Sequence, residues 1–106
     1  MAQVDTTPKQ TVREMTEFRW NALYVIAAAE PVKGTKICEE LEDYYGSEVN
    51  HGRLYPNLDT LVDMGLVTKR ERDRRTNEYR VTERAEAAMA HQQQWERDKF
   101  DAEVEA

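Results

Sequence analysis

The sequence contains one cysteine, Cys38, and two histidines, His51 and His91, which stand forty residues apart. A single cysteine cannot form a disulfide within its own chain, and two distant histidines do not have the spacing of metal ligands. We therefore expect a protein of the reducing cytoplasm that holds no metal ion or other cofactor. Cys38 stands among apolar neighbours in a helical pattern, which favours a buried structural thiol over a redox sensor.

Long apolar runs are also missing. No stretch of 18 apolar residues exists, and the first twenty residues carry six charges without an apolar segment between them. We therefore expect neither a membrane span nor a secretory signal. The sequence also lacks a nucleophile paired with a base, a carboxylate pair in a plausible cleft and a phosphate-binding loop, so catalysis is the function class that we expect least.

Positive charge is scarce overall and concentrated in one block. The net charge is −6, from 15 basic and 21 acidic residues. Residues 1–50 carry five basic and nine acidic residues, and residues 85–106 carry two and six, whereas residues 51–84 carry eight and six. A basic block in an acidic chain is what a DNA-binding surface requires. A solvated, salt-bridged hairpin explains the charges alone equally well.

The acidic excess suggests a second property. Twenty-one acidic residues beside only five lysines are typical of proteins from salt-loving organisms. Concentrated salt removes most of the free energy that comes from counterion release when a protein binds DNA. Arginines in fixed geometry would then be more useful than lysines.

The spacing of apolar residues predicts a small, mainly helical domain with one β-hairpin. A chain of 106 residues is long enough for a single core. Residues 1–10 have no periodicity and are expected to form a flexible arm, and Thr11 and Glu14 have the spacing of a capping box. The expected elements are helices over 11–29, 34–45, 50–64 and 82–106 and strands over 66–72 and 77–81.

The order of these elements predicts a winged helix-turn-helix. The helices over 34–45 and 50–64 are joined by a short turn that contains Gly46, and the hairpin that follows has the position of a wing. Residues 11–81 would then form the DNA-binding part. Residues 82–106 would form a long C-terminal dimerisation helix of the same domain.

Three short segments resemble the PadR family of winged-helix transcription regulators. They are Gly52-Arg53-Leu54-Tyr55-Pro56-Asn57-Leu58, Gly65-Leu66-Val67 and Tyr79-Arg80-Val81-Thr82-Glu83. The resemblance covers about residues 20 to 95 and is to the short subtype, which dimerises through one C-terminal helix. The chain departs from the family at 31–36, where Lys33 and Lys36 add two positive charges at the start of the second helix, and at the wing tip, 73–76.

The helix over 50–64 is expected to enter the major groove. Its residues Asn50, His51, Arg53 and Asn57 can reach base edges, where arginine favours guanine and asparagine favours adenine. The Tyr55 hydroxyl would donate to a phosphate, and the wing-tip arginines would enter the minor groove. The residues expected to contact double-stranded DNA are Lys33, Thr35, Lys36, Asn50, His51, Gly52, Arg53, Tyr55, Asn57, Lys69, Arg72, Arg74, Arg75 and Arg80.

The last helix has an apolar stripe that one small domain is too small to cover, which favours a homodimer. Such a dimer would bind a palindromic site with half-sites about 34 Å apart. Trp95 is interpreted as an aromatic contact between subunits, or alternatively as part of a site for a small aromatic effector that gates a repressor. A winged helix used for protein assembly is another alternative. The residues expected at the dimer interface are Met15, Phe18, Ala88, Met89 and Trp95.

Overall fold

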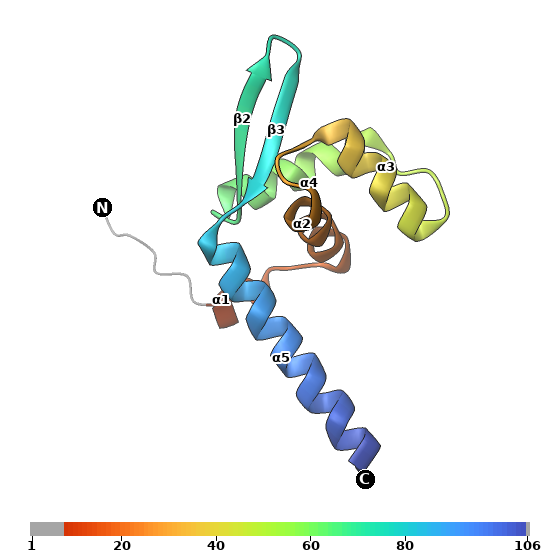
Figure 1. Cartoon of the computed structure of the whole chain (residues 1–106), viewed down its shortest axis with the longest axis vertical. Coiled ribbons are helices and arrows are strands. Elements are labelled where there is room, and N and C mark those ends of the chain that lie inside the picture. The colour runs from red at the N-terminus through yellow and green to blue at the C-terminus, as the bar shows by residue number, and fades with distance from the viewer. Residues whose placement is uncertain (1–7, 106) are drawn as a thin grey trace, which may run out of the picture.

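A computed structural model describes residues 8–105, which form five helices and a three-stranded antiparallel sheet (Figure 1). This architecture is a winged helix with a long C-terminal helix, and it confirms the predicted fold class. The elements are α1 (Pro8–Arg13), α2 (Glu17–Ala29), β1 (Val32–Lys33), α3 (Gly34–Tyr45), α4 (His51–Asp63), β2 (Val67–Asp73), β3 (Thr76–Val81) and α5 (Glu83–Glu105).

The first predicted helix is in fact two helices. α1 ends at Arg13, and α2 begins after Thr16, whose side-chain oxygen accepts a hydrogen bond from the Arg19 N–H at 3.2 Å. The expected cap, Thr11, lies inside α1 and is buried. Glu17 follows Thr16 in the first turn of α2, where a negative charge interacts favourably with the helix dipole. Of the expected arm, residues 8–10 belong to α1, and residues 1–7 lie outside the described range.

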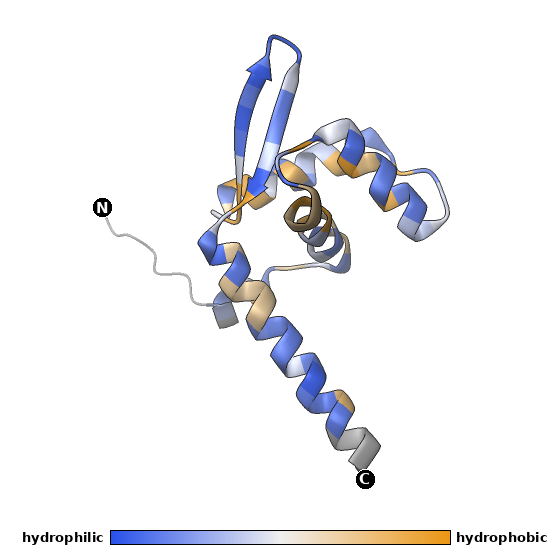
Figure 2. Ribbon diagram, viewed as in Figure 1, coloured by the Kyte–Doolittle hydropathy of each residue, from blue (hydrophilic) through white to orange (hydrophobic). Residues whose placement is uncertain are grey.

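The core lies between α2, α3, α4 and the base of the sheet. α3 and α4 end as predicted at Gly46 and Gly65, which adopt positive φ values of 70° and 78°. Figure 2 shows apolar residues on the sides of the helices that face one another. Eight leucine and isoleucine side chains are completely buried and form the centre of this core: Leu23, Ile26, Ile37, Leu41, Leu54, Leu58, Leu61 and Leu66.

A two-residue strand ties the start of α3 to the wing. β1 pairs with β3 in antiparallel fashion, with Val32 opposite Tyr79 and Lys33 opposite Glu78. The strand order is therefore β1-β3-β2. β1 was not predicted from sequence, because two residues after a proline have no periodicity. β1 holds the first turn of α3 beside the wing through its pairing with β3.

The wing is the hairpin of β2 and β3, and it projects away from the helices (Figure 1). Its register is irregular between Glu71 and Asp73. At the tip, the Asp73 carboxylate accepts a hydrogen bond from the Arg75 N–H at 2.9 Å. This bond lowers the pKa of Asp73 and is the main cause of that shift. A short acidic side chain thus stabilises a turn that has no glycine.

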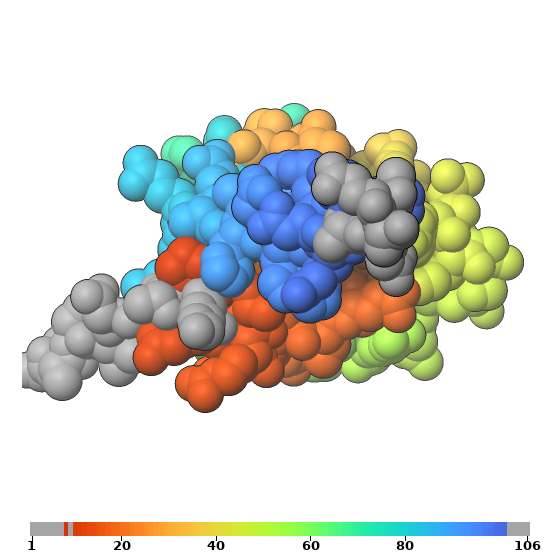
Figure 3. Space-filling view, turned by 90° about the horizontal axis from the view of Figure 1, so that it is seen from below, coloured from red at the N-terminus to blue at the C-terminus, as the bar shows by residue number. Residues whose placement is uncertain are grey.

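α5 begins at a junction made by Thr82. The Thr82 hydroxyl donates to the Gly65 carbonyl at 2.8 Å and accepts from the Ala85 N–H at 3.1 Å, so one side chain joins the end of α4 to the start of α5. α1 packs against α5, and Figure 3 looks towards the end of α5 with residues of α1 and α2 beside it. Farther along, α5 leaves the body of the domain (Figure 1).

Three of the five residues predicted for a dimer interface are already covered within the chain. Phe18, Ala88 and Met89 are buried inside this single chain, so their side chains have little surface left for a partner. An amphipathic pattern shows that one face of a helix is covered, but it does not show whether the same chain or a second subunit covers it. Met15 is half-buried, and Trp95 is 55% exposed.

Candidate nucleic-acid interface

The outward face of α4 has little side-chain bulk near its start. Leu54, Leu58 and Leu61 point to the core, so helical geometry places Gly52 and Pro56 on the opposite side, and both are exposed. The Asn50 side chain caps the helix by accepting a hydrogen bond from the Gly52 N–H. A Cβ atom on Gly52 would lie 2.9 Å from the Asn50 side-chain oxygen. Glycine therefore preserves this cap and leaves the helix start open to a large partner.

Arg53 and Asn57 lie on the flank of α4 that faces α2. The Arg53 guanidinium stacks over the Phe18 ring, 4.0 Å from its centroid, although the residue remains exposed. The Asn57 side-chain oxygen accepts from Arg19 Nε at 2.9 Å, and its amide group donates to the Arg53 carbonyl at 2.8 Å. Arg19 was not predicted as a site residue. Its proximity to Asn57 is a tertiary contact that helical spacing does not show.

Tyr55 lies on the other flank of α4, against the first turn of α3. A Cβ atom on Gly34 would lie 2.6 Å from the Tyr55 hydroxyl oxygen, so only glycine leaves room for the ring. The exposed His51 ring meets the Tyr55 ring edge to face, with centroids 5.8 Å apart. Burial raises the pKa of Tyr55, and Cys38 adds a smaller contribution.

The lysines before and within α3 differ in their surroundings. Lys36 pairs with Glu40 at 3.4 Å and with Glu39 at 3.9 Å on the exposed surface of the helix. Such pairs are weak, and they partly offset the positive charge of Lys36. Lys33 is exposed and immediately precedes α3, where it makes no ion pair with the described residues.

The basic residues of the wing fall into two groups. Lys69 pairs with Asp59 of α4 at 3.4 Å, and Arg72 pairs with Glu78 of the neighbouring strand at 3.3 Å. The other four are exposed and form no ion pair within residues 8–105. They are Arg70, Arg74, Arg75 and Arg80. Asp59 was not anticipated, and it places a negative charge on the exposed surface of α4.

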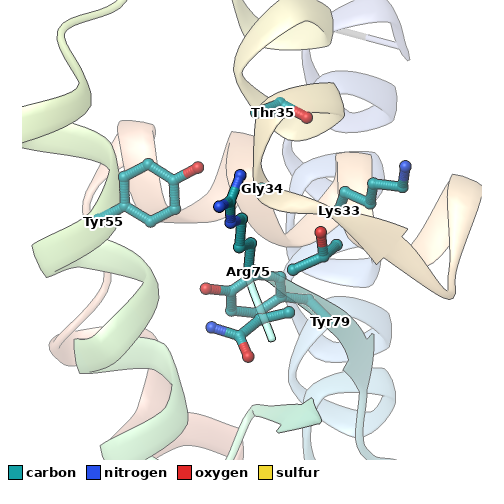
Figure 4. A pocket seen from close by; sticks show the side chains of 8 residues that line it. Lys33, Gly34, Thr35, Tyr55, Arg75 and Tyr79 are labelled. Carbon is teal, nitrogen blue, oxygen red and sulfur yellow. The ribbon is translucent and has the colours of Figure 1, made fainter. Parts of the chain in front are cut away.

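A cavity of about 350 Å³ lies where α3, α4 and the wing meet (Figure 4). Tyr79 of β3 also lines this cavity, although it was not among the residues expected to contact DNA. Burial raises the pKa of Tyr79 to about 12, with smaller contributions from Tyr55 and Asp59. Its hydroxyl therefore stays protonated at neutral pH. The side chains labelled around the cavity are Lys33, Gly34, Thr35, Tyr55, Arg75 and Tyr79.

Within residues 8–105, no three or more histidine, cysteine or acidic residues are placed together to hold a metal ion. No helix of the described part of the chain has the length and apolar character needed to cross a membrane. Cys38 is a buried free thiol whose pKa is raised by burial and by Glu42.

Comparisons with known proteins give one family and one group of similar structures. The model of the transcriptional regulator PadR-like family matches residues 22–91. RosR of H. salinarum, in the structure grown from NaBr, is 50% identical with a TM-score of 0.79, and the match covers 84% of this chain and 80% of RosR. The complex structure of RosR with S4 gives 48% identity and a TM-score of 0.83, over 88% of this chain and 80% of RosR.

A more distant structure shares the fold alone. FabT of Streptococcus pneumoniae, solved in complex with DNA, is 17% identical with a TM-score of 0.67, and the match covers 89% of this chain and 63% of FabT. The comparison with curated proteins gave no match.

Proposed function

Because the chain belongs to the PadR-like family of transcriptional regulators, we propose that it acts as a homodimer that binds double-stranded DNA through α4 and the wing. α4 would lie in the major groove, and the wing would contact the backbone and the minor groove. Residues 11–81 would form the DNA-binding part, and residues 82–106 the dimerisation helix. The proposed place of action is the cytoplasm. The family consists of regulators, in agreement with the expectation that the chain is not an enzyme.

The observation that carries this proposal is the combination of the open start of α4 with the basic wing. Gly52 and Pro56 present little bulk to an incoming duplex, and four wing arginines have no acidic partner among the described residues. Free arginines are available to replace the counterions of phosphates. A chain of net charge −6 that keeps this end basic is suited to a polyanionic partner.

The contacts of Arg53 and Asn57 suggest different roles for them. Arg53 is exposed and held over the Phe18 ring, so it is preorganised for contact with a guanine. Asn57 already bonds to Arg19 and to the Arg53 backbone. We assign Asn57 to the positioning of these two arginines rather than to adenine recognition, which revises the expectation from sequence.

Sequence selection from random DNA, followed by fluorescence anisotropy on the selected duplex, tests the proposal. Arg53→Ala should weaken binding to the selected sequence about tenfold to a hundredfold, the range for loss of one bidentate base contact. Arg13→Ala, which removes an exposed arginine of α1 outside α4, the wing and α5, is the matched control and should bind normally. Arg74→Ala/Arg75→Ala should weaken binding to every sequence and lower the salt slope by about two.

Failure of the protein to bind any duplex would refute the DNA proposal and favour the use of this winged helix in protein assembly. The titrations should be run at low and high salt. We propose that the protein works at high salt, and two facts support this: the acidic composition, and the identity of 50% with RosR of H. salinarum.

A cavity of about 560 Å³ between α2 and α5 favours a second candidate, in which a small aromatic effector modulates the regulator. Trp20 and Tyr24 contribute its aromatic surface, and Gln92 and Gln93 its polar groups. Trp95, the expected effector residue, does not line this cavity. Binding of an aromatic dye should quench Trp fluorescence in Trp95→Phe but not in Trp20→Phe. Absence of quenching by a broad dye panel in the parent protein would remove this candidate.

A further inference from the structure

The cavity between α3, α4 and the wing differs in charge from the other large cavities of the described chain. Three of those are each lined by two acidic residues, namely Glu17 and Glu96, Glu42 and Glu48, and Glu40 and Asp43. The cavity at α3 is lined by Lys33 and Arg75 and by no acidic residue. In an acidic protein this is a local environment that favours an anion.

The first turn of α3 directs backbone donors at this cavity. α3 has twelve residues, and its N-cap residue, Lys33, makes no side-chain hydrogen bond to the helix. The N–H groups of the first turn therefore have no side-chain acceptor, and the helix dipole adds positive potential there. Gly34 and Thr35 of this turn both line the cavity. Such a helix start is suited to binding a phosphate or another anion.

Tyr79 provides an independent indication of a ligand. The residue is only 2% exposed and lines the cavity, and among the described residues its hydroxyl has no hydrogen-bond partner. Because this oxygen is not one of the fully buried unpaired atoms, it reaches the open space of the cavity, where it can donate to a ligand. Figure 4 shows the hydroxyls of Tyr55 and Tyr79 on the same side of the cavity, with the Arg75 side chain between the two residues in this view.

Gly34 determines whether Tyr55 can take part. The Tyr55 ring occupies the space where a Cβ atom of residue 34 would lie, at 2.7 Å from its ring carbon and 2.6 Å from its hydroxyl. This close contact brings the Tyr55 hydroxyl to the N-terminus of α3. A neutral donor from α4 therefore meets the backbone donors of α3.

We propose that this cavity binds a phosphate group. The donors are the first-turn amides of α3 and the hydroxyls of Tyr55 and Tyr79, and the balancing positive charges are Lys33 and Arg75. The inference rests on the proposed function, because in the complex the group is a phosphodiester of the DNA backbone, held between the recognition helix and the wing. Tyr79 is then not only a buried residue but also part of the DNA-binding surface.

Replacing each tyrosine by phenylalanine removes only its hydroxyl oxygen, and it tests whether this cavity binds a phosphate of the DNA backbone. Tyr79→Phe and Tyr55→Phe should each weaken binding of a random-sequence duplex about tenfold, the usual effect of losing one hydrogen bond to a charged group. Because a phenol is neutral, the salt slope should stay constant. Arg75→Gln, by contrast, should lower that slope by about one. Tyr44→Phe, an exposed tyrosine outside the cavity, is the matched control and should bind like the parent.

Amide NMR with inorganic phosphate distinguishes the two sources of the phosphate group. At matched ionic strength, phosphate but not chloride should shift the Gly34 and Thr35 amide signals, and Tyr79→Phe should abolish the shift. If phosphate binds but both tyrosine variants hold DNA like the parent, free phosphate is the ligand and the DNA assignment is overturned. If the variants change neither the phosphate-induced amide shifts nor the affinity for DNA, the site itself is refuted.

The same data separate this inference from the proposed function. If the parent protein and the tyrosine variants bind duplex DNA equally well, the proposed function stands and the phosphate site is refuted. If the parent protein shows the phosphate-induced shifts but binds no duplex, the phosphate site stands and the proposed function is refuted. Gly34→Ala, which displaces Tyr55, should reproduce the loss seen in Tyr55→Phe.

Discussion

The two ends of the molecule differ in how completely one chain covers their apolar residues. α4, at the wing end, buries Leu54, Leu58 and Leu61 completely. The buried residues of α5 extend only as far as Met89, and beyond it Trp95 and Phe100 are 55% and 65% exposed. Figure 2 shows the distal part of α5 as mostly hydrophilic, with an isolated hydrophobic position near its end. The wing end is thus folded by the chain alone, whereas the distal part of α5 has a surface suited to a second copy.

The largest expected effect tests the wing end. Leu58→Ala, in the middle of α4, should lower the free energy of unfolding by about 3 kcal/mol, because it leaves a cavity in a completely buried site. Urea denaturation followed by circular dichroism measures the change. Phe100→Ala, assayed at concentrations where the chain is monomeric, should change it little. Equal losses in both variants would contradict the difference between the two ends.

The next effect tests the distal part of α5. Trp95→Ala should raise the dimer dissociation constant about thirtyfold, which corresponds to the roughly 2 kcal/mol that an aromatic residue at the centre of an interface contributes. Sedimentation equilibrium measures the constant, and Gln94→Ala is the neighbouring control. An unchanged dissociation constant in Trp95→Ala would place the interface elsewhere.

A smaller change in the free energy of unfolding is expected at Thr11, whose buried side chain lies in α1. The Thr11 side-chain oxygen is buried and has no hydrogen-bond partner among the described residues. Thr11→Val keeps the shape and removes the unpaired hydroxyl, so it should raise the free energy of unfolding by about 1 kcal/mol. Thermal unfolding checks the sign. A loss of stability would show that the hydroxyl is satisfied in solution.

The smallest effect concerns the outer surface of α4. Asp59→Asn removes a negative charge from this surface and frees Lys69, which lies 3.4 Å away. DNA binding should become about two to three times tighter, in keeping with the modest energies of exposed ion pairs. Asp43→Asn makes the same change in net charge on α3 and should have less effect. Anisotropy at low salt, where exposed charges matter most, is the suitable assay.

Local periodicity explains why the fold was largely predictable from sequence. The spacing of Leu54, Leu58 and Leu61 indicates a helix whatever surrounds it, and Gly46 and Gly65 mark helix ends that require positive φ. The separation of α1 from α2 was missed because Thr11 and Thr16 both resemble caps. β1 was missed because its two residues become a strand only by pairing with Tyr79 and Glu78, more than forty positions later.

The candidate site was less predictable because its members meet only in the folded chain. Residue type and position selected Arg53, Tyr55 and the wing arginines from sequence. The contact of Asn57 with Arg19 and the position of Tyr79 at a cavity depend on tertiary packing. Likewise, the apolar positions Phe18 and Met89 were assigned to a dimer, although the chain covers them itself.

The junction at Thr82 gives α5 the properties of a lever. One hydroxyl connects the end of α4 with the start of a helix of 23 residues, which is about 35 Å long. With the pivot at Thr82, a tilt of about 5° moves the far end of that helix by roughly 3 Å. In the proposed dimer, the angle at this pivot therefore governs the separation of the two recognition helices. Thr82→Val keeps the side-chain volume, removes both hydrogen bonds and would make this mechanical coupling looser.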